Sequence, residues 1–303
     1  MKNLIPISLI AILFTTAIHA QELNVLRKNN VIVLYDDGIE NAAVAVAQTY
    51  PAVRDGLEKI IGWVVDFTPT IYLVSTHERF ERMSGHSLVV GFAVPEKTLI
   101  VIDYSKILSD PFSMSSIMEH ELCHLLLHKN ISRKNLPKWL DEGVAQWASG
   151  GIADIIMTDN SRIDYAVLTG RQIPFKYLAQ NFPRDNEGLM LAYAQSKSIV
   201  DYMSGEYGSA GIQNLLNSLR AGNDINDAVS GTFRASFDEL EKNWYSDIKK
   251  KATWLTLLIN HLYEIVFFLA AVSLIIGYIK IVIRKRAERY EDDDEGDQQN
   301  HNI

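Results

Sequence analysis

Two histidines, His120 and His124, stand four residues apart in the segment His-Glu-Leu-Cys-His. On a helix this spacing puts both imidazoles on one face, one turn apart, so both can reach one metal ion. Neutral imidazole and carboxylate ligands suit zinc, which in catalytic sites keeps a fourth position for water. Glu121 lies next to His120 but off the ligand axis, and it can accept a proton from that water. The segment therefore predicts a zinc site able to perform hydrolysis.

A third ligand is predicted in the stretch Pro-Lys-Trp-Leu-Asp-Glu-Gly that begins at Pro137. Pro137 is well placed to open a second helix, with Glu142 five residues into it. Two antiparallel helices joined by a short loop would bring Glu142 level with His124. A carboxylate near a helix start is also favoured by the helix dipole, and Asp141 could serve equally well there. Together with the two histidines, Glu142 is interpreted as the third metal ligand.

The helix that carries the histidines is predicted over 111–128 without reference to them. Asp110 and Pro111 suit a cap and a first helical position. An apolar stripe follows at helical spacing, formed by Ile117, Met118, Leu122, Leu125 and Leu126. Further helices are predicted over 137–149, 189–207, 209–220 and 236–250. His128, near the end of the first helix, is interpreted as a helix-end cation, and Cys123 as a small buried thiol.

The region before these helices has the pattern of a small sheet. Short β-branched runs predict strands over 31–35 and 70–75, and a hairpin over 89–94 and 98–102 around Pro95-Glu96-Lys97. A helix is expected over 41–61, kinked or divided at Pro51. Strands first and helices later predict an α+β domain, a small mixed β-sheet lobe followed by a helical lobe, with its functional cleft between the two halves.

The first twenty residues have the pattern of a secretory signal peptide. Lys2 precedes an apolar run from Leu4 to Phe14, and small or mixed residues follow up to Ala20. Residues 1–20 are therefore expected to direct export. Whether the leader is removed or kept as a second anchor is left open.

The other end of the chain is predicted to cross a membrane once. The stretch from Ile265 to Ile283 contains one charged residue, Lys280. A basic cluster follows at 284–289, and such clusters mark the cytoplasmic side of a span. The expected organisation is an exported domain over 21–251, an interfacial segment and transmembrane helix over 252–283, and a cytoplasmic tail over 284–303, basic and then acidic. The N-terminal domain would lie outside the cytoplasm.

Composition excludes several other classes of protein. The 303 residues are 48% hydrophobic, which is incompatible with a disordered chain. A formal net charge of −8 gives no basic surface for nucleic acid, so no nucleic-acid partner is expected. The single cysteine excludes an intrachain disulfide.

Over residues 70–245 the sequence resembles the gluzincin metallopeptidases, in particular the peptidase MA-like group. The shared features are the segment from His120 to His124, the Trp-Leu-Asp-Glu-Gly block ending at Gly143, Ile173-Pro174, and the helix start at Tyr193. The resemblance implies a zincin-like fold in which His120, His124 and Glu142 bind zinc and Glu121 is the general base. In thermolysin an aspartate four residues after the glutamate orients a histidine; here that position is Gln146.

The resemblance also implies a mechanism, in which a water activated by zinc hydrolyses a peptide bond and Glu121 moves the proton. In related aminopeptidases a tyrosine from a later helix stabilises the oxyanion, and Tyr193 is the candidate here. Gluzincins commonly run an edge strand along the cleft, and 91–93 would be that strand. The expected partners are a peptide or protein substrate and, through the C-terminal helix, a membrane.

The alternative interpretation is a non-catalytic binding or assembly protein that keeps the zincin fold and is anchored in the membrane. Glu121 argues against it, because a purely structural zinc site has no use for a free carboxylate beside the metal. A choice between endopeptidase and aminopeptidase stays open, although the absence of a Gly-Ala-Met-Glu-Asn type segment favours the former slightly.

Overall fold

The computed structural model describes residues 23–85, 89–107, 113–151, 161–252, 259 and 261–299. The predicted signal peptide at 1–20 and the predicted helix cap at Asp110 lie outside these residues. Contacts within the chain divide it into two units. The first comprises Met1–Thr158 and Pro174–Phe237, and the second comprises Asp159–Ile173 and Asp238–Ile303.

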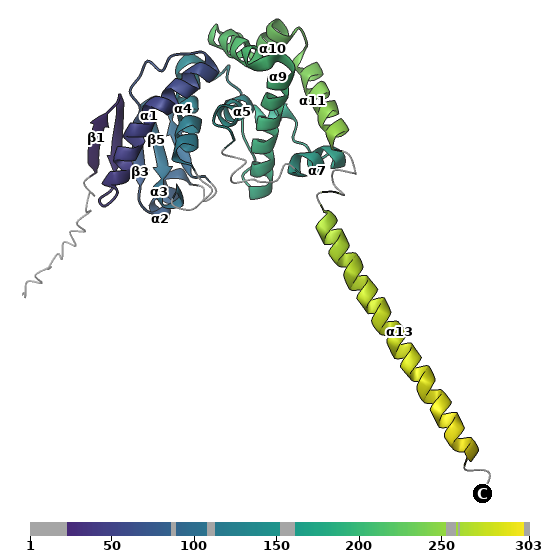
Figure 1. The fold of residues 1–303 in the computed structure, drawn as a ribbon. Helices are drawn as coiled ribbons and strands as arrows, with labels where there is room; N and C mark the ends of the chain where they lie inside the picture. The colour runs from purple at the N-terminus through teal and green to yellow at the C-terminus, as the bar shows by residue number, and fades with distance from the viewer. Residues whose placement is uncertain are drawn as a thin grey trace, which may run out of the picture. The chain divides into compact units, whose positions relative to one another are not determined.

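A five-stranded sheet occupies the early part of the first unit (Figure 1). Its strands are β1 (Asn24–Lys28), β2 (Val31–Tyr35), β3 (Thr70–Val74), β4 (Gly91–Val94) and β5 (Leu99–Asp103). Their order is β1-β2-β3-β5-β4, with β2, β3 and β5 parallel and the two edge strands antiparallel to their neighbours. The predicted mixed sheet is therefore confirmed. β4 and β5 form the predicted hairpin, joined by the 3-10 turn η1 (Pro95–Lys97).

Side chains of the inner strands alternate between the two faces of the sheet, as the pleat requires. On one face Tyr72, Val74 and Val101 pack around Phe80 of α2 (His77–Ser84). The alternate positions, among them Ile71, Leu73 and Ile100, are fully buried. The helices α1 (Glu40–Ile61) and α4 (Met114–Asn130) contact each other and the strands, and cover the sheet. Burial of these positions fixes α4 against β4 and β5.

β1 is absent from the sequence-based prediction, because its run Asn-Val-Leu-Arg-Lys contains only two apolar residues and stays largely exposed. The turn that joins it to β2 carries a clearer signal. Asn29 and Asn30 have φ values of 54° and 61°, both in the left-handed region. A two-residue hairpin turn with this geometry favours asparagine at both positions.

The helix expected over 41–61 is present as α1, and of the two expectations for Pro51, a kink or a division, the division is absent: one helix runs through the proline. A proline inside a helix leaves the carbonyl four residues earlier without its N–H donor. Here that carbonyl belongs to Ala47, and the Asn29 side-chain amide donates to it at 2.8 Å. The turn between β1 and β2 thus supplies the hydrogen bond that Pro51 cannot.

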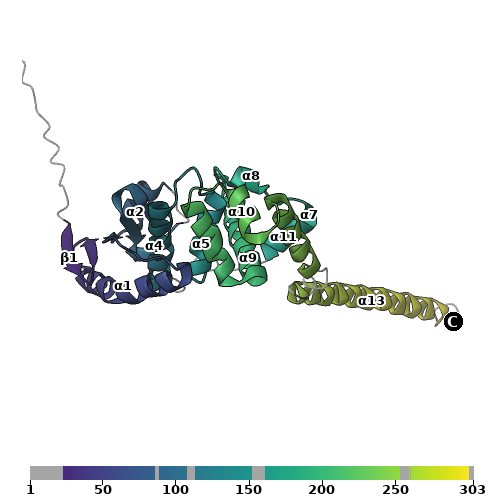
Figure 2. The ribbon, with the colours of Figure 1, turned by 90° about the horizontal axis from the view of Figure 1, so that it is seen from above.

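Helices make up the rest of the first unit. They are α3 (Tyr104–Ile107), α5 (Lys138–Ala148), α8 (Phe175–Leu178), α9 (Asn186–Arg220) and α10 (Ile225–Phe233). The predicted break between 207 and 209 is present inside α9, where Gly208 has non-helical φ and ψ values of 71° and 171°. The predicted helical lobe is confirmed, and α3, α8 and α10 are additions that the sequence pattern does not give. Figure 2 shows α5 beside α9.

The contact between α5 and α9 depends on one glycine. A β-carbon at Gly143 would lie 2.3 Å from the backbone oxygen of Ser196, far inside van der Waals contact. The two helix backbones can approach this closely only because position 143 has no side chain.

The second unit contains α7 (Ser161–Thr169), α11 (Phe237–Lys251) and α13 (Leu262–Gln299). Within it the Tyr245 hydroxyl donates to the Val167 carbonyl at 3.2 Å, joining α11 to α7. The part of α13 from Leu262 to Arg284 is long and apolar enough to cross a membrane, and none of its most apolar stretch is buried. The predicted apolar C-terminal helix is therefore present.

Candidate metal centre and active site

The helix α4 carries the two histidines on the side that faces α5 and β4. Leu122, Leu125 and Leu126 occupy its other sides and are buried in the core, which fixes the rotation of the helix. His120 and His124 are each 8% exposed, and Glu121 is 5% exposed. Three polar groups are thus held at the edge of the core, where they need partners.

The three predicted metal ligands converge. The Nε2 atoms of His120 and His124 are 3.2 Å apart. The Glu142 Oε2 atom, from α5, lies 3.8 Å from the first and 3.6 Å from the second. Zinc–nitrogen bonds of 2.0–2.1 Å in a tetrahedron separate two ligand atoms by about 3.3 Å. The triangle of donor atoms therefore fits one face of a tetrahedral zinc site.

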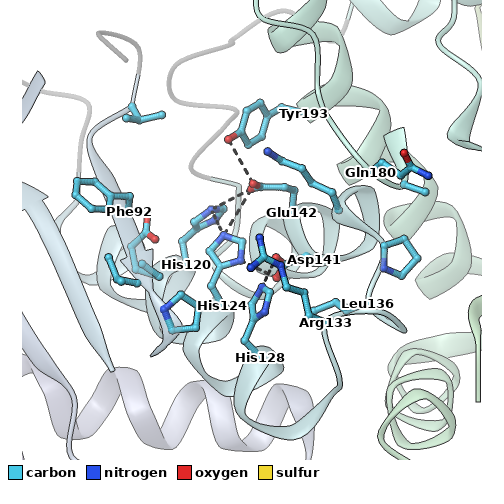
Figure 3. A pocket seen from close by; sticks show the side chains of 18 of the residues that line it. Phe92, His120, His124, His128, Arg133, Leu136, Asp141, Glu142, Gln180 and Tyr193 are labelled. Carbon is cyan, nitrogen blue, oxygen red and sulfur yellow. Dashed lines mark hydrogen bonds and ion pairs between the residues drawn. The ribbon is translucent and has the colours of Figure 1, made fainter. Parts of the chain in front are cut away.

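Asp141, next to the third ligand, holds two imidazoles at once. Its Oδ1 accepts from His124 Nδ1 at 2.8 Å, and its Oδ2 accepts from His128 Nε2 at 2.8 Å (Figure 3). A proton on Nδ1 leaves the Nε2 lone pair of His124 free to bind a metal. A carboxylate behind a metal-binding histidine commonly fixes its tautomer and ring orientation in this way.

The electrostatics of the site favour positive charge at its centre. Burial opposes charge on His124, yet the Asp141 and Glu142 carboxylates outweigh it and raise its pKa well above the usual value. Burial and the neighbouring His124 lower the pKa of His120 to about 4. Burial likewise opposes ionisation of Asp141, but His124 and His128 lower its pKa. The negative charges of Asp141 and Glu142 beside the two imidazoles therefore favour a cation at this point.

Glu121 lies between the predicted metal ligands and the edge strand β4. Burial raises the pKa of Glu121 to about 8, with Glu142 and Asp141 adding to the rise, while the charge of His124 and a hydrogen bond from Ala93 oppose it. A β-carbon at Gly91 would lie 3.0 Å from the Glu121 Oε1 atom. The bare glycine backbone of β4 thus leaves room for the carboxylate.

Tyr193, on α9, reaches the site from the side opposite β4. Its hydroxyl donates to Glu142 Oε1 at 3.5 Å. Gln146 lies behind both residues and donates to the backbone carbonyls of Glu142 and Tyr193, at 3.2 and 3.1 Å. Gln146 therefore joins α5 to α9, whereas Asp141 holds His124.

These groups open into a cavity of about 850 Å³. The cavity is lined by the segment 89–94, by residues of α4 and α5, and by the segment 133–137. Leu189, Met190 and Tyr193 come from α9, and Asp224 and Ile225 from the start of α10. Figure 3 shows His120, His124, Glu142 and Tyr193 pointing toward one another in this cavity. Its size and mixed lining suit a peptide segment.

The sequence pattern does not assign the partners of Asp141 and His128. His128 does lie in the last turn of α4, as expected for a helix-end cation, but it also pairs with Asp141. The four-residue spacing of His120, His124 and His128 is the sequence signal for the place of His128 beside the site, since residues at intervals of four share one helix face.

Comparison with known proteins identifies the family. The sequence profile of the Peptidase MA superfamily matches residues 71–250, more than half of the chain. The chain belongs to the Peptidase MA superfamily. The predicted resemblance to the gluzincin, peptidase MA-like group is thereby confirmed. No curated protein matches this superfamily member in sequence.

Two solved structures resemble this Peptidase MA protein. One is an M1 zinc metallopeptidase from Deinococcus radiodurans bound to a Tyr-Ser-Ala substrate, with 13% identity and a TM-score of 0.47 over 74% of this chain and 51% of the other. The second is a yeast LTA4 hydrolase in complex with bestatin, with 14% identity and a TM-score of 0.43 over 76% of this chain and 37% of the other. This chain spans about half the length of the first and less than half of the second.

Proposed function

We propose that this member of the Peptidase MA superfamily is a zinc-dependent peptidase anchored in a membrane, with its catalytic site outside the cytoplasm. The observation that supports the proposal best is the convergence of His120 Nε2, His124 Nε2 and Glu142 Oε2 on one point. The buried Glu121 carboxyl beside that point is the second. A structural metal site needs only the three converging ligand atoms, whereas hydrolysis also needs a base such as the Glu121 carboxylate.

The residues that would hold zinc are His120, His124 and Glu142. When bound, zinc would supply an acidified water and polarise the carbonyl of the scissile bond. Asp141 keeps the His124 ring in the tautomer that presents Nε2. His128, on the other oxygen of Asp141, holds the carboxylate in place.

Glu121 is proposed as the general base. Its carboxylate takes a proton from the attacking water and gives it to the nitrogen of the leaving amine. Burial raises the pKa of Glu121, and a zinc cation held beside it would favour the ionised carboxylate that a general base needs. A hydrogen bond from the Ala93 backbone holds the Glu121 carboxylate against β4, the strand along which the substrate backbone would lie.

Tyr193 is proposed to donate a hydrogen bond to the developing oxyanion. Burial and the adjacent Glu142 carboxylate raise its pKa well above the usual value, so the hydroxyl keeps its proton and stays a donor. A preorganised donor of this kind contributes on the order of a hundredfold to the rate of acyl transfer.

The substrate is proposed to bind as an extended strand along β4. β4 is an edge strand, paired with β5 on one side, and Val89 to Val94 line the cavity. The backbone groups of an edge strand can pair with a peptide, and this mode of binding accepts many sequences.

Anchoring is proposed to follow the organisation expected from the sequence. Residues 1–20 would direct export, 21–251 would form the exported domain, and 252–283 would carry the interfacial segment and the single span, within α13. The basic residues from Arg284 onward would keep the tail 284–303 in the cytoplasm.

The proposal is tested on the full chain purified in detergent, by comparing the parent with Glu121→Gln. Elemental analysis should find one zinc per chain in both. Cleavage of an unstructured protein substrate should fall at least a hundredfold in Glu121→Gln. A chelator should abolish cleavage by the parent, and added zinc should restore it.

Other outcomes would contradict the proposal. Equal cleavage by both chains would exclude Glu121 as the base. Stoichiometric zinc without cleavage by either chain would favour a binding protein that keeps the fold. Less than stoichiometric zinc in both chains would contradict the ligand assignment.

A further inference from the structure

Three positively charged side chains that are close together in the sequence line the cavity. Arg133 and Lys134 belong to the segment that connects α4 to α5, and Lys138 is the first residue of α5. The chain as a whole has a formal net charge of −8, so the charge of this group is opposite in sign to that of the chain. We call Arg133, Lys134 and Lys138 the cationic wall.

The cationic wall contributes little to the stability of the fold. Arg133 pairs with Glu96 at 3.8 Å, but the two side chains are 87% and 70% exposed, and such pairs contribute little to stability. Within the part of the chain that the structure describes, no carboxylate lies within ion-pair distance of Lys134 or Lys138. Lys138 also occupies the first turn of a helix, where the dipole disfavours a cation.

Lys138 is the best-positioned member of the wall. It stands four residues before Glu142 on α5, so both side chains leave the helix on the same side. Lys138 is half-buried, and its ammonium lies 5.0 Å from the centre of the Phe182 ring. A charge held in a partly buried wall acts more strongly on a ligand than one in open solvent.

Most carboxylates that line the cavity already have partners. Asp141 is held by two imidazoles, and Glu142 lies with the histidines. Asp224 caps α10 by accepting from the backbone N–H groups of Asn226 and Asp227, at 2.9 and 3.0 Å. Glu96, which also lines the cavity, pairs with Arg133. Lys134 and Lys138, which have no such carboxylate partner among the described residues, are therefore able to bind a carboxylate of a ligand.

We propose that the cationic wall binds a carboxylate of the substrate, so that the preferred substrates carry negative charge near the cleaved bond. This inference rests on the proposed peptidase function of the same site. The carboxylate can come from an aspartate or glutamate side chain or from the free C-terminus of the peptide. Both sources offer the same oxygen acceptors to Lys138, with Lys134 and Arg133 adding attraction over a longer distance.

The test uses the full chain in detergent and a peptide that the parent cleaves. In one series, glutamate or glutamine is placed at each position around the cleaved bond, with the C-terminus amidated. In the other, neutral peptides of several lengths carry a free or an amidated C-terminus. The readout is the ratio of kcat/KM for the charged peptide to that for its neutral partner. Binding of the same peptides to Glu121→Gln, followed by fluorescence anisotropy, gives a second readout that needs no turnover.

The parent should favour the charged peptide by about tenfold in at least one series, the size expected for one charged hydrogen bond. Lys138→Gln should bring the ratio close to one, and Lys138→Arg should retain it. Lys138→Glu should prefer a lysine-containing peptide. Lys129→Gln is the matched control, because Lys129 is an exposed lysine of α4 that does not line the cavity, and it should keep the parent's ratio.

A ratio near one in the parent, or one unchanged by Lys138→Gln and by removing Lys134 and Arg133, overturns the inference while the peptidase function stands. Absence of cleavage, with charged peptides still binding Glu121→Gln about tenfold more tightly, supports the cationic wall and contradicts the peptidase function. Equal binding of charged and neutral peptides to Glu121→Gln contradicts the inference without reference to catalysis.

Discussion

At the scale of single residues, the site shows how adjacent carboxylates on one helix divide two tasks. Asp141 and Glu142 are separated by about 100° around the helix. Glu142 meets His124 at Nε2, and Asp141 meets the same ring at Nδ1. One imidazole is thus held from both sides, which fixes its orientation before any metal binds.

Replacing Asp141 with asparagine removes the negative charge from behind His124 and leaves the shape almost unchanged. Loss of such a partner usually weakens metal binding by about 10–100-fold. We expect Asp141→Asn to bind zinc at least tenfold more weakly, measured by competition with a chromogenic chelator. Asp201→Asn is the control, since that carboxylate pairs with Lys197 on the surface of α9. Equal zinc affinity in Asp141→Asn and the parent would contradict the role given to Asp141.

The candidate ligands were predictable from sequence because helical periodicity alone puts His120 and His124 on one face. The inclusion of Glu142 needed only a short connection between two helices. The role of Asp141 was not predictable in this way. Which neighbour of Glu142 turns toward His124 depends on the rotation of α5, and packing against α9 sets that rotation. The role of each residue in binding and catalysis stays a prediction.

At the scale of secondary structure elements, the approach of α9 to α5 decides where Tyr193 lies relative to Glu142. Gly143 permits that approach, and Gln146 links the two helices through its side-chain amide. Neither residue touches the cavity centre, yet both control the geometry around Glu142.

Replacing Gly143 with alanine should therefore damage stability and the site together. The added carbon would meet a backbone atom that cannot swing away, so the helices must separate. Overpacking of this kind costs about 1–3 kcal/mol. We expect a lower Tm by calorimetry and a lower kcat. Gly231→Ala on α10, where an added carbon meets nothing within 4 Å, should do neither. A Tm for Gly143→Ala equal to that of the parent would show that α5 and α9 can move apart without loss of stability.

Other elements show where sequence patterns succeed and fail. The strand predicted over 31–35 coincides with β2 because its apolar run is buried in the sheet interior. The break at Gly208 was visible because two apolar periodicities meet there. That Pro51 does not divide its helix could not be predicted locally, because the Ala47 carbonyl, which loses its N–H donor, accepts instead from Asn29 in a turn 18 residues away. A local sequence pattern does not show a hydrogen bond that a distant segment supplies.

At the scale of the whole molecule, the chain combines the Peptidase MA match over 71–250 with an apolar helix near its C-terminus. The sequence predicts both, because neither depends on how distant segments pack. The basic residues after the apolar stretch assign the tail to the cytoplasm under the proposed topology.

That topology can be tested with single cysteines, because the chain's own Cys123 is fully buried and gives little background. In intact cells a membrane-impermeant maleimide should label Glu206→Cys, at an exposed position of α9, once the outer layers of the cell are made permeable to it. Asn302→Cys should be labelled only after the cytoplasmic membrane is opened. Labelling of Asn302→Cys before that point, with Glu206→Cys protected, would reverse the orientation.

The segment from Ile131 to Pro137 joins the helix bearing the two histidines to the helix bearing Glu142, and five of its seven residues face the cavity. Inserting or deleting a residue there would shift the third ligand relative to the first two. A change in the length of this connection would therefore alter the metal site, whereas exchange of its side chains would alter only the lining of the cavity.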